Sequence, residues 1–278
     1  MASERENYIL IETNRSMLKQ IRIKNALMVV LLFSIVSCSS EQQKIVDLEK
    51  INTDFDVSKF YKDKLKLTND IISTDIKKLK KEEVKKLMDY PMFIKDTLCY
   101  FKDVDNRLGG GIYIESKNDW MTKKLTPEKT FGYNYRTVSW NPERDTLAVL
   151  NKVPFPQLNM TESEDGDLVL VKASKSSKNI DTYNKLKDFL DKKYGKGKSI
   201  ESERSHEQIT GWATEKFIFQ LKKFESEQED ILSFDSEEDK AAAKETVFDI
   251  DYLIFNRKYQ KEIKKTGNSF GGINLANY

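Results

Sequence analysis

Few side chains in this sequence are of the kinds that act as nucleophiles, general bases or metal ligands. The only histidine, His206, stands in a polar stretch, which excludes a histidine-rich zinc site and leaves any Ser-His or Cys-His unit dependent on one residue. The two cysteines are Cys38 and Cys99. Cys99 lies in a run of strand-forming residues, which favours a buried side chain over a reactive thiol. The sequence therefore predicts no catalytic residue, no metal site and no cofactor.

The segment at 103–111 combines acids and glycines, as calcium and phosphate loops do. A calcium loop needs an oxygen donor at its fifth position, where Arg107 stands. A phosphate loop continues through Gly-Lys-Ser or Gly-Lys-Thr into a helix, whereas Gly111 is followed by Ile112. Both hypotheses fail, and the segment is interpreted as the turn of a hairpin.

Three aromatic side chains could bind a sugar by stacking. Phe131, Tyr133 and Tyr135 alternate along a predicted strand that continues to Trp140, so their rings are expected on one face of a sheet. Tyr133, Tyr135 and Trp140 could stack on a sugar, although such rings more often belong to a core. Two carboxylates about 5–10 Å apart could hydrolyse a glycoside on any fold. No specific pair stands out, and glycan binding or cleavage stays open as the alternative function.

Residues 17–37 have the layout of a secretory signal peptide. Cations precede an apolar run, and small or aliphatic residues end it directly before Cys38. The cations are Lys19, Arg22 and Lys24, and the residues before the cysteine are Ile35, Val36 and Ser37. The apolar run, 26–36, is about half of the ~20 residues that a membrane-spanning helix needs. We therefore expect a cleavable export signal, with residues 1–16 as an upstream extension that precedes a start at Met17.

The end of this pattern resembles the lipobox of bacterial lipoproteins, in which an aliphatic residue and a small one precede an invariant cysteine. The resemblance implies diacylglycerol on the Cys38 thiol, cleavage before Cys38 and acylation of the new amino group. Two or three acyl chains would hold the protein firmly at a membrane. Ser39 stands where some lipoproteins carry the aspartate of inner-membrane retention, so the resemblance implies outer-membrane sorting. Ser39 to Glu41 also resembles a surface-export leader of Bacteroidota, and the periplasmic and surface faces both stay open.

The balance of basic and acidic side chains limits the classes of partner that the protein can bind. The chain has 47 basic and 45 acidic side chains, and removal of residues 1–37 would leave 42 of each. Lysines alternate with acids, as on solvated helix faces, and no concentrated basic stretch indicates nucleic-acid binding. The expected partners are a membrane, through lipid on Cys38, and a protein of unknown identity.

The first part of the mature chain is predicted to contain a tether at 38–56 and an α+β half at 57–155. Apolar spacing predicts a helix from Thr74 to Tyr90, because Pro91 prevents its continuation. Strands are expected in pairs, one pair at 97–101 and 111–115, and another at 131–140 and 146–153 around an Asn141–Arg144 turn.

The second half is predicted at 156–266, with an acidic insertion at 225–240 and a loose tail at 267–278. The apolar run Leu168–Val171 indicates a central buried strand, and a helix is expected over 180–194. Two strands, at 217–222 and 248–254, are expected to be antiparallel neighbours. The helix ends at Tyr194-Gly195, and Gly211-Trp212 follows in a strand. This combination resembles uncharacterised small α+β modules of bacteria, which implies a fold and no activity.

Together these patterns predict an α+β fold with helices packed on antiparallel sheet, in one domain or in two halves that meet near residue 155. The expected function is that of a lipid-anchored protein of the bacterial cell envelope, at the outer membrane, with a non-enzymatic binding role. An immunity protein or an accessory subunit of an outer-membrane complex would fit this expectation.

Overall fold

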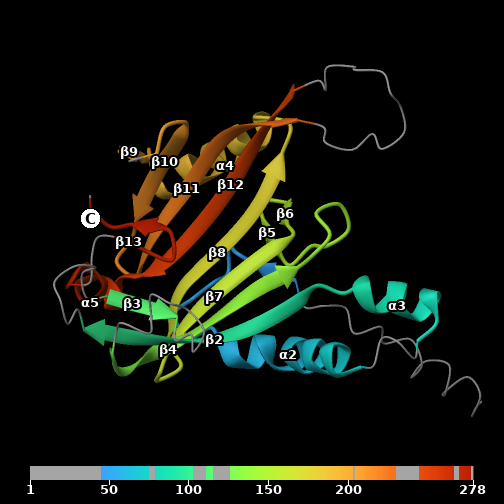
Figure 1. The fold of residues 1–278 in the computed structure, drawn as a ribbon. Helices are drawn as coiled ribbons and strands as arrows, with labels where there is room; N and C mark the ends of the chain where they lie inside the picture. The colour runs from blue at the N-terminus through green and yellow to red at the C-terminus, as the bar shows by residue number, and fades with distance from the viewer. Residues whose placement is uncertain are drawn as a thin grey trace, which may run out of the picture. The chain divides into compact units, whose positions relative to one another are not determined.

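The computed structural model describes most of the chain after residue 44 (Figure 1). The described residues are 45–74, 79–102, 111–114, 126–202, 204–229, 244–265, 269–276 and 278. The predicted extension, signal peptide and Cys38 lie outside them, as do most of the glycine-rich loop at 103–111 and of the acidic insertion. Among the described residues, no helix is long and apolar enough to cross a membrane.

A nine-stranded antiparallel sheet forms the centre of the fold and confirms the predicted α+β class. In spatial order its strands are β3 (Gly111–Ile114), β2 (Met92–Lys102), β4 (Thr126–Ser139), β7 (Gln157–Ser163), β8 (Leu168–Ser177), β12 (Lys244–Asn256), β11 (Phe217–Glu229), β10 (Glu207–Ala213) and β9 (Lys198–Ile200). The sheet runs unbroken through both predicted halves, and β8 stands in its middle, as its apolar run predicts.

Helices and two small sheets lie on the faces of this large sheet, except for α3, which stands beyond the start of β2 (Figure 1). The helices are α2 (Val57–Ser73), α3 (Lys81–Met88), α4 (Asp181–Tyr194), the 3₁₀ turn η3 (Arg257–Tyr259) and α5 (Gln260–Lys265). One small sheet contains β1 (Val46–Asp47), β5 (Ala148–Leu150) and β6 (Val153–Phe155), and the other contains β13 (Ser269–Phe270) and β14 (Ile273–Asn274).

The core has two layers because both faces of the sheet are buried. Along β12, Ile250, Tyr252 and Ile254 join one cluster, and Leu253 and Phe255 join the other. Since side chains alternate across a strand, the two clusters lie on opposite faces. Residues of α2, α4 and the β1–β5–β6 sheet pack on the first face, and residues of η3, α5 and the C-terminal segment pack on the second.

Several predicted elements are confirmed. Helix α4 ends at Tyr194, where Gly195 has a positive φ of 85°, a conformation that glycine adopts without steric cost. Strands β11 and β12 are antiparallel neighbours along their whole length, and β2 pairs with β3 as a hairpin.

The second predicted hairpin is wrong. Strand β4 pairs with β2 and β7, whereas β5 pairs with β1 and β6. The predicted turn is present, but it directs the chain away from the large sheet. Its backbone is closed by the Asp145 carboxylate, which accepts a hydrogen bond from the Asn141 N–H at 2.7 Å. Leu147, which follows, is 1% exposed and enters the core.

The predicted placement of Phe131 with the two tyrosines is also wrong. In the β2–β4 ladder, Leu98 pairs with Gly132 and Cys99 pairs with Thr130, so Phe131 is the extra residue of a β-bulge. A bulge shifts the alternation of side chains by one. Phe131 therefore packs in the second cluster, whereas Tyr135 packs in the first.

The helix predicted from Thr74 to Tyr90 begins later than expected. Thr74 caps the C-terminus of α2, a helix that the sequence pattern did not predict, and α3 starts at Lys81. The predicted tether and tail differ from the structure as well. Leu48 is 2% exposed, and Leu275 is fully buried on the second face. Both ends of the described chain therefore complete the core.

Candidate functional site

The candidate site is built around the first turns of α2, which lie over β2, β4 and β7. Asp56 caps the helix, and its carboxylate accepts a hydrogen bond from the Lys59 N–H at 2.8 Å. Val57 and Tyr61 are fully buried and Thr68 is 2% exposed. This stripe attaches one side of α2 to the sheet, so the side chains beside the stripe line the boundary between helix and sheet.

A buried acid, Glu162, lies beneath the start of α2. In β7, Leu158, Met160 and Glu162 alternate toward the first face, and Glu162 is 3% exposed. A β-bulge in β8 follows directly, because Thr161 pairs with Leu170 and Glu162 pairs with Leu168. A carboxylate at such a core position needs hydrogen-bond partners to offset the loss of water.

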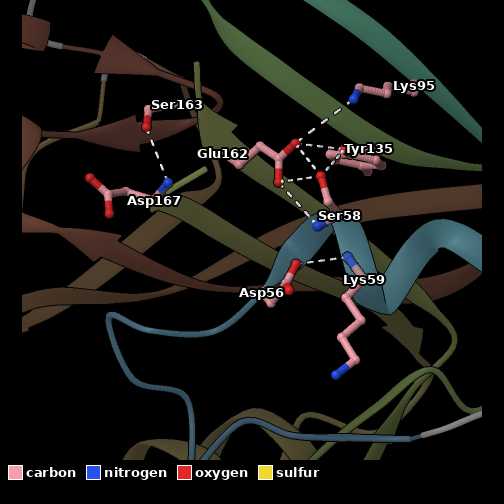
Figure 2. Close-up of polar contacts among 8 residues, drawn as sticks. All are labelled: Asp56, Ser58, Lys59, Lys95, Tyr135, Glu162, Ser163 and Asp167. Atoms are coloured by element: carbon pink, nitrogen blue, oxygen red, sulfur yellow. Dashed lines mark hydrogen bonds and ion pairs between the residues drawn. The ribbon is translucent and has the colours of Figure 1, made fainter. Parts of the chain in front are cut away.

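The partners of Glu162 come from two other elements (Figure 2). Its Oε2 accepts a hydrogen bond from the Ser58 N–H at 3.0 Å, and its Oε1 accepts one from Ser58 Oγ at 2.7 Å. The Tyr135 hydroxyl donates to Oε1 at 2.6 Å. The carboxylate thus joins the N-terminus of α2 to β4 and β7, where it also faces the positive end of the helix dipole.

The Tyr135 ring is fixed by Tyr61. The two rings stack with centroids 4.9 Å apart, and the Tyr61 hydroxyl donates to the Leu158 carbonyl at 2.8 Å. Tyr61 is fully buried and Tyr135 is 1% exposed. Burial, followed by the hydrogen bond to Glu162, raises the pKa of Tyr135 above its ordinary value. The Tyr135 hydroxyl therefore stays protonated and acts as a donor to Glu162.

Lys95 stands at the edge of this network (Figure 2). Its ammonium lies 3.7 Å from the centre of the Tyr133 ring and 5.2 Å from that of Tyr135. It also lies 3.9 Å from Glu162 Oε1. Cation–π contacts of this kind are electrostatically favourable. They hold the Lys95 charge near one position, although its side chain is 37% exposed.

An open groove of about 740 Å³ runs along this side of α2. Ten residues line it: Asp56, Ser58, Lys59, Lys62, Leu65, Lys66, Asn69, Asp70, Lys95 and Tyr135. Four of them are lysines and two are aspartates, so the lining carries a net positive charge. Its volume falls within the range of about 300–1,000 Å³ that is common for ligand sites.

Three of the lysines, Lys59, Lys62 and Lys66, project from consecutive turns of α2 and are exposed. Within the described part of the chain, no carboxylate lies at ion-pair distance from their ammonium groups. Their charges are therefore available to a ligand. The arrangement fits an anionic group or an acidic chain that lies along the helix.

The contacts of Ser58 give it a structural role at the start of α2. Glu162 accepts hydrogen bonds from Ser58 N–H and from Tyr135 as well as from Ser58 Oγ. These bonds occupy most of the lone-pair positions that a carboxylate offers. Ser58 and Glu162 therefore position the start of α2, and the lysines of the groove lie on the same helix.

The structure separates the aromatic residues that the sequence singled out. Tyr135 contributes to the groove but its ring is buried, and the Tyr133 ring is covered by Lys95. Trp140, 39% exposed, follows the end of β4 and does not line the groove. The three rings do not form one platform.

The other chemical candidates lie elsewhere. His206 is exposed in the turn between β9 and β10, with a φ of 67°, and Cys99 is 4% exposed in β2. Among the described residues, no group of three histidines, cysteines or acids is arranged to hold a metal ion.

Sequence reasoning missed Glu162, Ser58, Lys95 and the lysines of α2. The available signal was the period-two row Leu158-Met160-Glu162, which places an acid where a strand buries its side chains. Comparisons of the chain with family models, with curated proteins and with solved structures found no match.

Proposed function

We propose that this protein is a lipid-anchored component of the bacterial cell envelope with a non-enzymatic binding role, and that the groove along α2 receives an acidic partner. The observation that carries the binding role is the row of exposed lysines beside a rigid, fully hydrogen-bonded helix start. The anchor rests on the sequence around Cys38. A protein partner, as for an immunity protein or an accessory subunit, suits an open groove whose lining carries four lysines.

The absence of an assembled catalytic unit in the described residues supports binding over catalysis. The acid nearest to the groove floor, Glu162, is engaged in positioning α2. The remaining acids of the lining, Asp56 and Asp70, belong to α2 and its cap. Asp56 is occupied as that cap.

The test is capture of the partner by the native lipoprotein in intact envelopes, with charge reversal in the groove. The groove variant carries Lys62→Glu and Lys66→Glu. The matched control carries Lys185→Glu and Lys192→Glu, which reverse two exposed lysines on α4. Chemical cross-linking, affinity purification and quantitative mass spectrometry then compare both variants with the unmodified chain.

We expect the groove variant to lose its partner and the control to retain it. An exposed ion pair contributes about 0.2–1 kcal/mol, and reversal replaces attraction by a similar repulsion. Two reversals should therefore weaken binding by about 2 kcal/mol, or ~30-fold. The loss should grow as ionic strength falls, because screening weakens exposed charges.

Equal recovery of the same partner by both variants would contradict the proposal. Enrichment of carbohydrate in place of protein, independent of the groove lysines, would instead support the alternative of a glycan-binding lipoprotein.

A further inference from the structure

Of the seven large apolar side chains that are exposed among the described residues, four lie at one end of the fold. These four, Ile45, Tyr90, Val138 and Trp140, are 54%, 46%, 42% and 39% exposed. We call these four residues the apolar end. Monomeric proteins rarely expose apolar side chains in groups without a binding role.

The pairing of strands brings the apolar end together. Met92, at the start of β2, pairs with Ser139, at the end of β4. Tyr90 and Trp140 therefore flank the same end of this strand pair. Val138 is the extra residue of a β-bulge there, because Phe93 pairs with Thr137, and the bulge accounts for its exposure.

The turn after β4 connects Ile45 to the same place. Arg144 in this turn binds Asp89, the neighbour of Tyr90, with Nη1 and Oδ1 2.8 Å apart. Three residues later, the Leu147 carbonyl accepts a hydrogen bond from the Val46 N–H at 2.9 Å. The first described residue, Ile45, is thus adjacent to the turn.

Charge at the apolar end is partly compensated. The Arg144 guanidinium lies 2.8 Å from carboxylate oxygens of both Asp89 and Asp145. The repulsion of these acids from an anionic surface is therefore reduced. One cation against two anions leaves a net charge of −1 on these groups, and Glu143 in the same turn is exposed. The tryptophan and the tyrosine match the interfacial region of a bilayer, where amphipathic rings are enriched.

The short length of chain between Cys38 and Ile45 favours the bilayer as the partner of the apolar end. Six residues separate Cys38 from Ile45. The seven steps from one Cα to the next span at most ~3.6 Å each in a fully extended chain, or about 25 Å. A protein held by lipid on Cys38 must keep Ile45 within that reach of the membrane surface. We infer that the apolar end docks on the bilayer and orients the protein on it; this inference rests on the proposed lipid anchor.

The test uses the lipidated full chain in phospholipid vesicles that carry the charge of the native membrane. Tyr90 is replaced by the photoreactive p-benzoylphenylalanine in one variant and Tyr113 in the matched control. Tyr113 is 38% exposed and pairs with Cys99 near the other end of β2. At a rise of ~3.3 Å per residue, the seven steps from Met92 to Cys99 place Tyr113 about 23 Å from the start of β2. Both changes exchange one aromatic ring for another.

Irradiation followed by mass spectrometry counts lipid adducts at each position, and the mass of the Cys38 peptide reports the anchor. With lipid on Cys38, several-fold more adducts at position 90 than at position 113 are expected. Equal adduct yields in the lipidated chain, or protein adducts alone at position 90, would overturn the docking surface and leave the anchor intact. A bare Cys38 would overturn both the anchor and the inference that depends on it.

Discussion

Removal of the Tyr135 hydroxyl tests whether the Glu162 network holds α2 to the sheet. Tyr135→Phe deletes a hydrogen bond of 2.6 Å to a buried carboxylate. Tyr61→Phe is the matched change, because it deletes a hydrogen bond of 2.8 Å to the neutral Leu158 carbonyl. The two rings stack on each other and are 1% and 0% exposed, so burial and packing are nearly identical.

The expected magnitudes differ because the acceptors differ. A hydrogen bond to a charged group contributes about 1.5–3 kcal/mol, and one between neutral groups about 0.5–1.5 kcal/mol. The Leu158 carbonyl also keeps a second donor, the Thr137 hydroxyl at 2.9 Å. We therefore expect Tyr135→Phe to lower the free energy of unfolding by ~2 kcal/mol, and Tyr61→Phe by ~1 kcal/mol.

Urea unfolding, followed by tryptophan fluorescence, measures both free energies of unfolding. An m-value equal to that of the unmodified protein would show that unfolding of the variant exposes the same amount of surface. In thermal unfolding, each kcal/mol should lower Tm by about 2–4 °C for a unit of this size. A double-mutant cycle of Tyr135→Phe and Glu162→Gln isolates the interaction between the two side chains, and we expect a coupling energy of at least ~1 kcal/mol. A loss for Tyr61→Phe that equals or exceeds the loss for Tyr135→Phe would refute the reasoning, as would a coupling energy near zero.

Two further predictions concern other contacts of the fold. At Gly211 an added Cβ would lie 1.7 Å from the Tyr278 hydroxyl oxygen, so Gly211→Ala should cost about 1–3 kcal/mol of unfolding free energy. Adding Tyr278→Ala should relieve most of that cost in urea unfolding, and no relief would contradict the clash. Burial acts to raise the pKa of Asp191, but hydrogen bonds from Lys187, Gly197 and Trp212 outweigh it and lower that pKa below 3.8. The ionised Asp191 therefore stabilises the fold fully above about pH 4, and this contribution is lost as the pH falls through the pKa of Asp191 in the folded state. Asp191→Asn should lower the free energy of unfolding at pH 7 and flatten its dependence on pH in acid. An unchanged dependence in acid would contradict this.

The elements that the sequence predicted are those with strong, regular periodicity. Helix α4 places Tyr183, Leu186 and Leu190 on one buried stripe, and β11 and β12 alternate apolar and polar residues over long stretches. Apolar residues that keep one period over many positions fit either a helix or a strand but not both, so the type of element can be predicted. In α2 the buried stripe includes a threonine, Thr68, whose hydroxyl accepts a hydrogen bond from the Phe93 N–H at 3.0 Å. A polar residue that is buried for its hydrogen bond weakens the apolar period, and the helix was missed.

The candidate site depends on features that short-range patterns do not encode. Bulges at Phe131 and Val169 shift the alternation of side chains in β4 and β8, and single-sequence reasoning has no means of locating them. Strand β5 pairs with the two-residue strand β1, which lies about 100 residues earlier at the start of the described chain. The network of Ser58, Tyr135 and Glu162 joins three elements that are far apart in sequence, so only the fold reveals it.

The lysines of the groove should differ in how much each contributes to partner binding. Lys59, Lys62 and Lys66 are exposed on α2, and each must lose side-chain freedom when a partner binds, at about 0.5–1.5 kcal/mol per ordered side chain. Lys95 is already held by Tyr133 and by the Glu162 network, so it should lose less. Lys95→Met should therefore weaken partner binding more than Lys59→Met, although both remove one charge. Quantitative capture by the two variants measures this difference. Equal losses would show that the position of Lys95 adds nothing to its charge.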